Sequence, residues 1–361
     1  MTENVIVQCR APLRIGLAGG GTDIPPYVDL YGSEVLNCTI NLYVHGELAT
    51  GGKELLIRCR DSGAQFKATD ISQLTLQGPL AIQQAVYHYF IEHHHQGKFI
   101  FCSIDTWSEV RFGSGLGASS ALTVALIKGF CELLNLPTSS QMLARTAYEI
   151  ERTKLNLKGG LQDQYAAAFG GFNHFSFLSQ YDNKVTPLTL SQTMRHALES
   201  QIILIDSQIL RSPGQAIEAQ SLQIKQCNAL RLNYLHKIRT SVIPMAQALA
   251  DEDIMQFWSL FNSACEQKHH LGEAVLPDSI APLFRFVMEQ GALAGKVCGA
   301  GGGGFMLFAL PNDKSDIIKA KIRHSFFSHI VQIKIVEQGA QAITVKQQAE
   351  HLSQEPCVWM S

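Results

Sequence analysis

Apolar residues recur along the chain with both strand and helix periods. Alternating or short apolar runs predict strands at 3–10, 35–36, 40–48, 55–59, 99–105, 172–177, 202–206, 305–310, 330–336 and 341–346. Helical spacing predicts helices at 79–96, 121–134, 138–157, 215–249, 255–271, 280–291 and 313–328. Because both halves mix strands with helices and the strands come in hairpin-like pairs, the pattern predicts an α+β fold rather than a doubly wound parallel sheet.

The polar stretch 180–195 contains no long apolar run and is the candidate boundary between two domains. A chain of 361 residues exceeds what one hydrophobic core usually supports. We therefore expect an N-terminal domain over 1–190 and a C-terminal domain over 191–361.

Composition and charge exclude several classes of protein. The chain is 46% hydrophobic and 17% charged, with a net charge of −2, which is typical of a folded protein without a basic surface. We therefore expect neither nucleic acid nor a membrane as a partner. The chain has no long apolar span and no recognisable signal peptide, and its nine cysteines form no CxxC pair. These features predict a cytoplasmic protein with reduced thiols.

The first glycine cluster follows Arg14 and reads Gly19-Gly20-Gly21-Thr22-Asp23. Consecutive glycines allow close backbone approach to a ligand. Thr22 and Asp23 would then present a hydroxyl and a carboxylate at the edge of the loop, where a sugar hydroxyl could bind. The alternative is a tight turn in which Asp23 caps a helix starting near Pro25, and this cluster alone favours the turn.

The second cluster leads directly into the helix predicted at 121–134 and comprises Gly113, Ser114, Gly115, Leu116, Gly117, Ala118, Ser119 and Ser120. Free N–H groups at a helix N-terminus form an anion site, and serine hydroxyls add ligands for phosphate or Mg²⁺. A simple helix cap needs one serine rather than three alternate glycines, so phosphate binding is favoured. The loop matches neither a Walker A motif nor a dinucleotide fingerprint, and no protein-kinase motif accompanies it.

The third cluster, at 299–304, includes Gly301 and Gly302 and lies between two apolar segments. A flexible hairpin is the alternative, but close contact with a ligand or another loop explains so dense a run better. Glu151 and Asp163 flank a further glycine pair, Gly159-Gly160. Together with the Ser119 hydroxyl, these two carboxylates could serve one metal ion and one acceptor hydroxyl, as phosphoryl transfer requires.

The order and spacing of these clusters resemble those of the GHMP kinases, the superfamily of galactokinase, homoserine kinase and mevalonate kinase. The resemblance spans nearly the whole chain. It implies an N-terminal domain similar to ribosomal protein S5 domain 2, a ferredoxin-like C-terminal domain and an active site between them. The cofactors that it implies are ATP and Mg²⁺, and the expected assembly is a monomer or homodimer.

The resemblance also implies roles for individual residues. Asp163 matches the acid that orients or deprotonates the acceptor hydroxyl, and Arg14 matches the arginine beside it. Ser119 and Glu151 match the metal ligands, and Asp23 matches the sugar-hydroxyl ligand. The remaining expected contacts are residues 113–120, Gly301 and Gly302 for ATP, and Gly20, Gly21, Thr22, Gly160 and Gln162 for the substrate.

Within the superfamily, segments 19–27 and 159–168 are most similar to sugar-1-kinases, first those of heptose 7-phosphate and then those of L-fucose. The implied substrate is a sugar or sugar phosphate, most closely D-glycero-D-manno-heptose 7-phosphate, a precursor of cell-surface polysaccharide. A catalytically silent sensor is the alternative from another class. The chain departs from the family at Arg111-Phe112, at Ala118 and at Asn41.

Three further features have weaker interpretations. His93-His94-His95 cannot all face one ion on a helix, so an exposed helix end is expected. Trp107 could border an adenine pocket or pack in the core. Arg211 could bind a distal phosphate, although a surface position is the simpler expectation.

Overall fold

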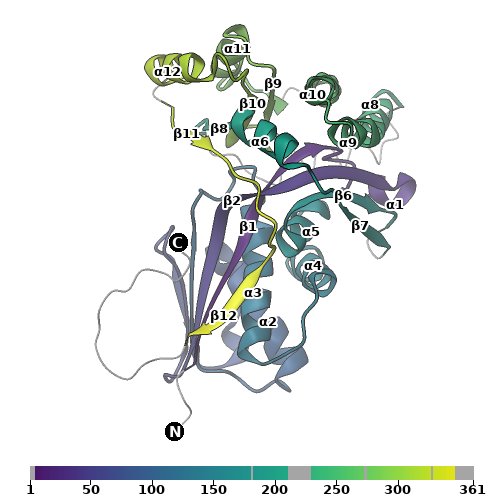
Figure 1. The fold of residues 1–361 in the computed structure, drawn as a ribbon. Helices are drawn as coiled ribbons and strands as arrows, with labels where there is room; N and C mark the ends of the chain where they lie inside the picture. The colour runs from purple at the N-terminus through teal and green to yellow at the C-terminus, as the bar shows by residue number, and fades with distance from the viewer. Residues whose placement is uncertain (1–4, 180–181, 210–228, 272–274, 327, 346–361) are drawn as a thin grey trace.

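The computed structural model describes residues 5–179, 182–209, 229–271, 275–326 and 328–345. They form an eight-stranded and a four-stranded sheet, each covered by helices (Figure 1). The predicted α+β class is confirmed. Strands β3 and β5 pair in parallel, and every other pair of named strands within the described part is antiparallel.

The larger sheet has the order β12-β1-β2-β5-β3-β4, with β6 and β7 added beside β2. Its strands are β1 (Ile6–Ala18), β2 (Ser33–Thr50), β3 (Leu55–Cys59), β4 (Gln65–Ala68), β5 (Cys102–Ser108), β6 (Phe172–Phe177), β7 (Asn183–Pro187) and β12 (Gln341–Val345). The two runs predicted at 35–36 and 40–48 are parts of the single long strand β2. Strand β7 lies inside the candidate boundary at 180–195, a segment in which no strand was predicted.

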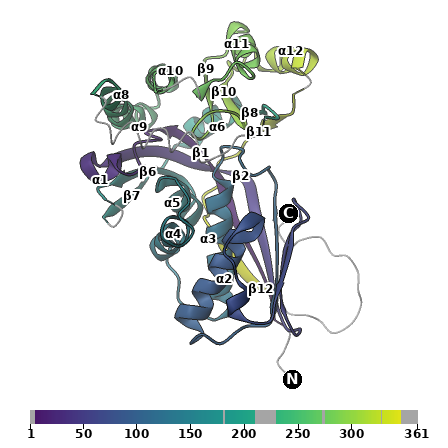
Figure 2. The same cartoon turned by 180° about the vertical axis from the view of Figure 1, so that it is seen from behind.

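Helices cover one face of this sheet (Figure 2). They are α2 (Ala81–His94), α3 (Ala118–Leu133), α4 (Ser140–Tyr148) and α5 (Gln162–Phe169), and short α1 (Tyr27–Tyr31) follows the first glycine loop. Helix α3 lies centrally and is buried over nearly its whole length, so its N-terminus is fixed rigidly against β1. The sequence places two serines, Ser139 and Ser140, where either could cap this helix, and it is Ser139 that accepts from the Met142 N–H.

The smaller sheet has the order β11-β8-β10-β9, formed by β8 (Ile202–Asp206), β9 (Ala294–Val297), β10 (Phe305–Ala309) and β11 (Ile330–Gln332). If these four strands are renumbered 1 to 4 along the chain, their order in the sheet is 4-1-3-2, which is that of a ferredoxin-like sheet. Its helices are α6 (Gln192–Gln201), α8 (Ala229–Thr240), α9 (Val242–Ala250), α10 (Ile254–His269), α11 (Ala281–Glu289) and α12 (Ser315–Phe326). Alternate strand residues serve two cores, because Ile203 and Ile205 pack with α11 and α12 whereas Ile202 and Leu204 join the main core.

The division proposed at residue 190 separates the two sheets except at the end of the chain. Strand β12 returns to the larger sheet and pairs antiparallel with β1, with Ile6 opposite Val345 (Figure 1). Two connections therefore join the halves, one after β7 and one before β12. Of the sequence interpretations, Arg211 and the first part of the helix expected at 215–249 lie outside the described residues.

Candidate active site

The second glycine cluster forms the turn between β5 and α3, as its composition suggested. Gly113, Gly115 and Gly117 have φ angles of +86°, +84° and +80°, a region that favours glycine. Helix α3 has Gly117 as its N-cap and no side-chain capping bond. Its first N–H groups are therefore available to an anion, where the helix dipole favours negative charge.

The third cluster packs directly on the second. A Cβ at Gly115 would lie 2.6 Å from the Cys298 carbonyl oxygen, and one at Gly304 would lie 2.4 Å from that of Ser114. The Phe305 N–H donates to the Ser114 carbonyl at 2.8 Å. These close approaches explain the glycines, and they join the C-terminal half to the candidate phosphate loop. Gly301 and Gly302 lie between these two contacts in the third cluster, and the Gly302 N–H donates to the Val275 carbonyl.

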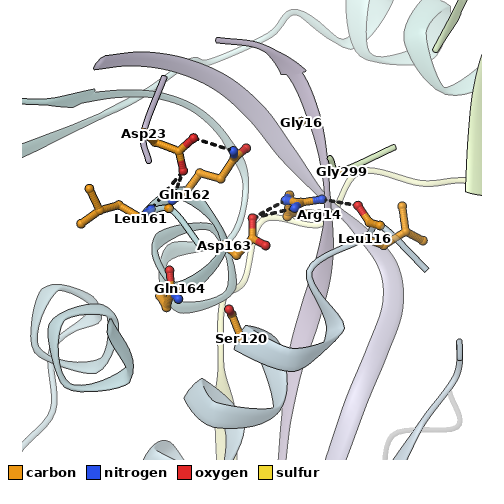
Figure 3. A network of polar contacts seen from close by, with 12 residues as sticks. Arg14, Gly16, Asp23, Leu116, Ser120, Leu161, Gln162, Asp163, Gln164 and Gly299 are labelled. Atoms are coloured by element: carbon orange, nitrogen blue, oxygen red, sulfur yellow. Dashed lines mark hydrogen bonds and ion pairs between the residues drawn. The ribbon is translucent and has the colours of Figure 1, made fainter. Parts of the chain in front are cut away.

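Arg14 connects β1, the phosphate loop and Asp163 (Figure 3). Its Nε and Nη2 lie 2.8 and 2.6 Å from Asp163 Oδ1, and its Nη1 donates to the Gly115 carbonyl at 2.7 Å. Arg14 is buried, whereas the Asp163 side chain is 27% exposed. The guanidinium thus holds Oδ1, while Asp163 Oδ2 makes no hydrogen bond to any described residue.

Glu151 lies beneath the start of α3, in a π-helical turn at Glu149–Lys154 that follows α4. Such turns shift the side chains beyond them and occur often at functional sites. Glu151 is 1% exposed, and its Oε2 accepts from Ser120 Oγ, Gln164 Nε2 and Arg152 Nη1 at 2.9, 2.9 and 3.1 Å. Its Oε1 is buried and has no hydrogen-bond partner among the described residues.

The two serines at the start of α3 therefore have different surroundings. Ser120 is buried and bonded to Glu151, whereas Ser119, the expected metal ligand, is exposed on the first turn. Hydroxyl and carboxylate oxygens are the ligands that Mg²⁺ prefers. An unsatisfied buried carboxylate oxygen beside a phosphate loop fits such an ion. The described residues contain no group of three or more His, Cys, Asp or Glu that could hold a metal.

The first glycine cluster differs from the expectation in one respect. Thr22 and Asp23 are 0% and 1% exposed, so their side chains lie inside the molecule and not at the edge of the loop. Thr22 Oγ1 bonds to the Gly19 carbonyl and to Ser33 Oγ. Burial raises the pKa of Asp23, as does the nearby Asp163, while N–H donors from Gln162 and Gly21 act in the opposite direction.

Lys296 was not singled out in the sequence. It extends from β9 of the smaller sheet, and its Nζ donates to the Gly16 carbonyl on β1 at 2.6 Å. A second contact between the halves is the ion pair of Arg111 and Asp206, in which Arg111 Nη2 lies 3.0 and 2.7 Å from the two carboxylate oxygens. Both contacts join residues far apart in sequence. The only signals in the sequence are that Lys296 lies beside the third glycine cluster and Arg111 directly before the second.

A pocket of about 370 Å³ opens at the turn between β3 and β4, lined by Arg58, Cys59, Arg60, Gly63, Ala64, Gln65 and Asp105. The Arg60 guanidinium lies 4.1 Å from the centroid of Trp107, whose other face stacks on His45. Trp107 therefore contacts a residue that lines this pocket, and it lies on the strand that leads into the phosphate loop. The three histidines at 93–95, by contrast, lie at the partly exposed end of α2, as expected.

Family models match both halves of the chain. The N-terminal domain of GHMP kinases matches residues 81–171, and the C-terminal domain of GHMP kinases matches residues 245–328. With the fold and the three glycine loops described above, these matches define the class of protein. The chain belongs to the GHMP kinase family.

Similar proteins support this membership. A D-glycero-alpha-D-manno-heptose 7-phosphate kinase from Campylobacter jejuni is 36% identical over 87% of this chain and 92% of its own length. An L-fucokinase/L-fucose-1-P guanylyltransferase from Bacteroides fragilis is 24% identical over 88% of this chain but only 36% of its own.

The solved structure of a D-glycero-D-manno-heptose 1-phosphate kinase from Bacteroides thetaiotaomicron superposes with a TM-score of 0.79. The two sequences are 31% identical, and the match covers 94% of this chain and all of that one. The prediction that the chain is an ATP-dependent sugar kinase of the GHMP superfamily is confirmed. No helix in the described residues is long and apolar enough to span a membrane.

Proposed function

We propose that this kinase transfers the γ-phosphoryl group of ATP to the C1 hydroxyl of D-glycero-D-manno-heptose 7-phosphate. The observation that carries the proposal is the Arg14–Asp163 pair, which adjoins a glycine-rich phosphate loop at an uncapped helix N-terminus. The similarity to a heptose 7-phosphate kinase over most of both chains supports the choice of acceptor.

Asp163 is the group that acts on the acceptor hydroxyl. Because Arg14 binds Oδ1, Oδ2 remains able to accept the hydroxyl proton as the acceptor oxygen attacks phosphorus. The oxygen–phosphorus bond to the acceptor forms, the bond to the β-phosphate breaks, and ADP leaves. Arg14 also contacts the loop at Gly115, so it fixes the acid relative to the phosphates.

Residues 113–120 hold the phosphates of ATP, with Gly301 and Gly302 completing the site from the third loop. We place the adenine in the pocket lined by Arg60, where the guanidinium that lies over Trp107 can also stack on a base. Its volume of about 370 Å³ lies within the range of small-ligand sites.

Ser119 and Glu151 would hold Mg²⁺, which supplies charge neutralisation at the transferred phosphate when bound. The unsatisfied Oε1 of Glu151 supports this assignment. Ser120 and Gln164 hold the other oxygen of Glu151, so they keep the free one in a fixed position.

The acceptor would lie in the corner formed by Gly20, Gly21, Thr22, Asp23, Gly160 and Gln162. L-fucose or another free sugar is the second candidate acceptor, which the similarity to a fucokinase favours. A silent sensor is less favoured because Arg14, Ser119, Glu151 and Asp163 are all present. We further propose that the protein works in the cytoplasm as a monomer or homodimer, without nucleic acid.

The decisive experiment measures ADP release from Mg²⁺–ATP with heptose 7-phosphate, heptose 1-phosphate, L-fucose and D-galactose, and locates the new phosphate by ³¹P NMR. We expect turnover with heptose 7-phosphate and a phosphate at C1. Asp163→Asn should reduce kcat by about 10²–10⁴-fold while ATP still binds. Absence of turnover with every sugar would refute the proposal, and a preference for L-fucose would replace the acceptor.

A further inference from the structure

Asp23 is buried against the start of helix α5, which carries Asp163. We propose that Asp23 is a positioning residue that holds this helix and the Gln162 amide, and that Gln162, not Asp23, contacts an acceptor hydroxyl. This inference rests on the proposed function, because it divides the roles of two residues in the proposed acceptor corner.

The hydrogen bonds of Asp23 use its whole carboxylate (Figure 3). Oδ2 accepts from the N–H groups of Leu161 and Gln162 at 3.0 Å each. Oδ1 accepts from Gly21 N–H at 3.1 Å and from Gln162 Nε2 at 3.0 Å. A carboxylate offers about four lone-pair sites. With four donors bound and a side chain that is 1% exposed, Asp23 has no free site for a sugar hydroxyl.

Two of these donors belong to the N-terminus of α5. Leu161 is its N-cap and Gln162 its first residue, and the helix has no capping bond from its N-cap side chain. Asp23 therefore caps the helix from 138 residues away, and its negative charge lies where the helix dipole favours it. Asp163 is the next residue. Arg14 holds its carboxylate, and Asp23 holds the backbone N–H groups of the two residues before it, so both partners fix the position of Asp163.

The bond to Asp23 also decides which way the Gln162 amide points. Only the NH₂ group can donate to a carboxylate, so Nε2 must face Asp23 and Oε1 must face away. Oε1 makes no hydrogen bond to any described residue, and Gln162 is partly exposed. Two glycines lie close to this oxygen. A Cβ at Gly16 would be 3.1 Å from Oε1, and a Cβ at Gly20 would be 3.8 Å from it.

These glycines leave space beside an amide oxygen in the acceptor corner. Lys296 closes the same corner from the other half of the molecule through its bond to the Gly16 carbonyl. A hydroxyl-bearing ligand that enters here meets the Gln162 oxygen first and is separated from the Asp23 carboxylate by the Gln162 side chain. Gln162 thus recognises the acceptor and Asp23 positions the helix, and one hydrogen bond joins their side chains.

The test compares Asp23→Asn with Gln162→Leu, and uses Gln141→Leu as a control because the Gln141 amide also contacts α5, at Tyr165, away from the acceptor corner. For each variant, calorimetry gives the affinity for heptose 7-phosphate without ATP, saturation kinetics give kcat, and amide hydrogen exchange of the ligand-free protein reports on residues 161–163. The thermal midpoint confirms that each variant is folded.

Asparagine keeps the shape of Asp23, and with its carbonyl oxygen at the Oδ1 position it retains the bond from Gln162 Nε2 but sets its own NH₂ against the N–H groups of Leu161 and Gln162. We expect Asp23→Asn to lower kcat about 10²-fold, to speed exchange at 161–163 and to change acceptor affinity less than about threefold. Gln162→Leu should weaken acceptor binding about tenfold, the equivalent of about 1.4 kcal/mol, with slow exchange retained. Gln141→Leu should leave all three measurements near the wild type.

The reverse pattern would overturn the inference: Asp23→Asn weakening acceptor binding while kcat and exchange stay at wild-type values, or Gln162→Leu binding the acceptor normally. Failure of the proposed function gives a different result, in which the wild-type chain neither binds nor phosphorylates any sugar. The exchange measurement needs no ligand, so it still decides whether Asp23 caps α5.

Discussion

Substitution of Gly160 by alanine gives a steric test of the contact between the first glycine loop and α5. A Cβ at this position would lie 2.0 Å from Asp23 Oδ2 and 2.5 Å from Asp23 Cγ. Ordinary contact begins at 3.4 Å, so the two segments must separate by 3.4 − 2.0, or roughly 1.4 Å. Gly160 has no positive φ, and backbone strain therefore adds nothing to this effect.

Such a separation would break both bonds from Oδ2 to the backbone N–H groups of Leu161 and Gln162, each now 3.0 Å long. A hydrogen bond to a charged group contributes about 1.5–3 kcal/mol. Because Asp23 can move and recover part of this, we expect Gly160→Ala to lower the free energy of unfolding by about 3 kcal/mol. The accompanying shift of Asp163 should lower kcat on the order of 10²-fold.

Gly159→Ala is the matched control. Its Cβ would meet Arg152 Nη2 at 2.3 Å, so the Arg152 side chain must move and give up its bonds to Glu151 and to the Gly160 carbonyl. We expect a loss of about 1–2 kcal/mol and a smaller change in kcat than in Gly160→Ala, because the bonds from Asp23 to α5 stay intact. Urea unfolding and saturation kinetics on both variants supply the comparison. Wild-type stability and turnover in Gly160→Ala would show that the contact does not hold the catalytic helix.

Three further predictions concern other parts of the molecule. Trp107→Ala should raise the KM for ATP about tenfold with the acceptor KM unchanged; an unaltered ATP KM would remove the adenine from this pocket. Glu151→Gln should raise the Mg²⁺ concentration needed for half-maximal activity at least tenfold, and an unchanged Mg²⁺ titration would exclude it as a ligand. Burial and the nearby Lys268 lower the pKa of His269, so its protonation opposes folding and stability should fall as pH drops below about 6.5. His269→Gln should reduce that fall, measured as thermal midpoints between pH 8 and pH 5, whereas an identical pH profile would contradict the assigned cause.

The sequence predicted the elements whose signals are local. Strands β3, β6 and β8 begin and end at the expected residues because apolar runs bounded by turn residues define them. A serine cap on α4 was also predictable, because a serine at a helix start commonly accepts from the first free N–H groups. Strand β7 was missed because it is a polar edge strand with little buried surface, and polar composition alone resembles a linker.

The site was predictable in its parts but not in its connections. Glycine spacing and family resemblance placed Arg14, Asp163 and the phosphate loop together. They did not reveal that Asp23 caps α5, since that bond spans 138 residues and depends on tertiary packing. Likewise, the position of Glu151 depends on a π-helical turn, which leaves no distinct mark in the amino-acid pattern.

The return of β12 to the edge of β1 has a consequence for synthesis of the chain. Strand β1 ends at Ala18 and its partner β12 begins only at Gln341, so β1 leaves the ribosome long before β12 does. Until then β1 presents an unpaired edge, which is a site for wrong pairing with other chains. A chain truncated before residue 341 would keep every proposed catalytic residue yet remain permanently open at that edge, so we expect it to aggregate rather than only to lose stability.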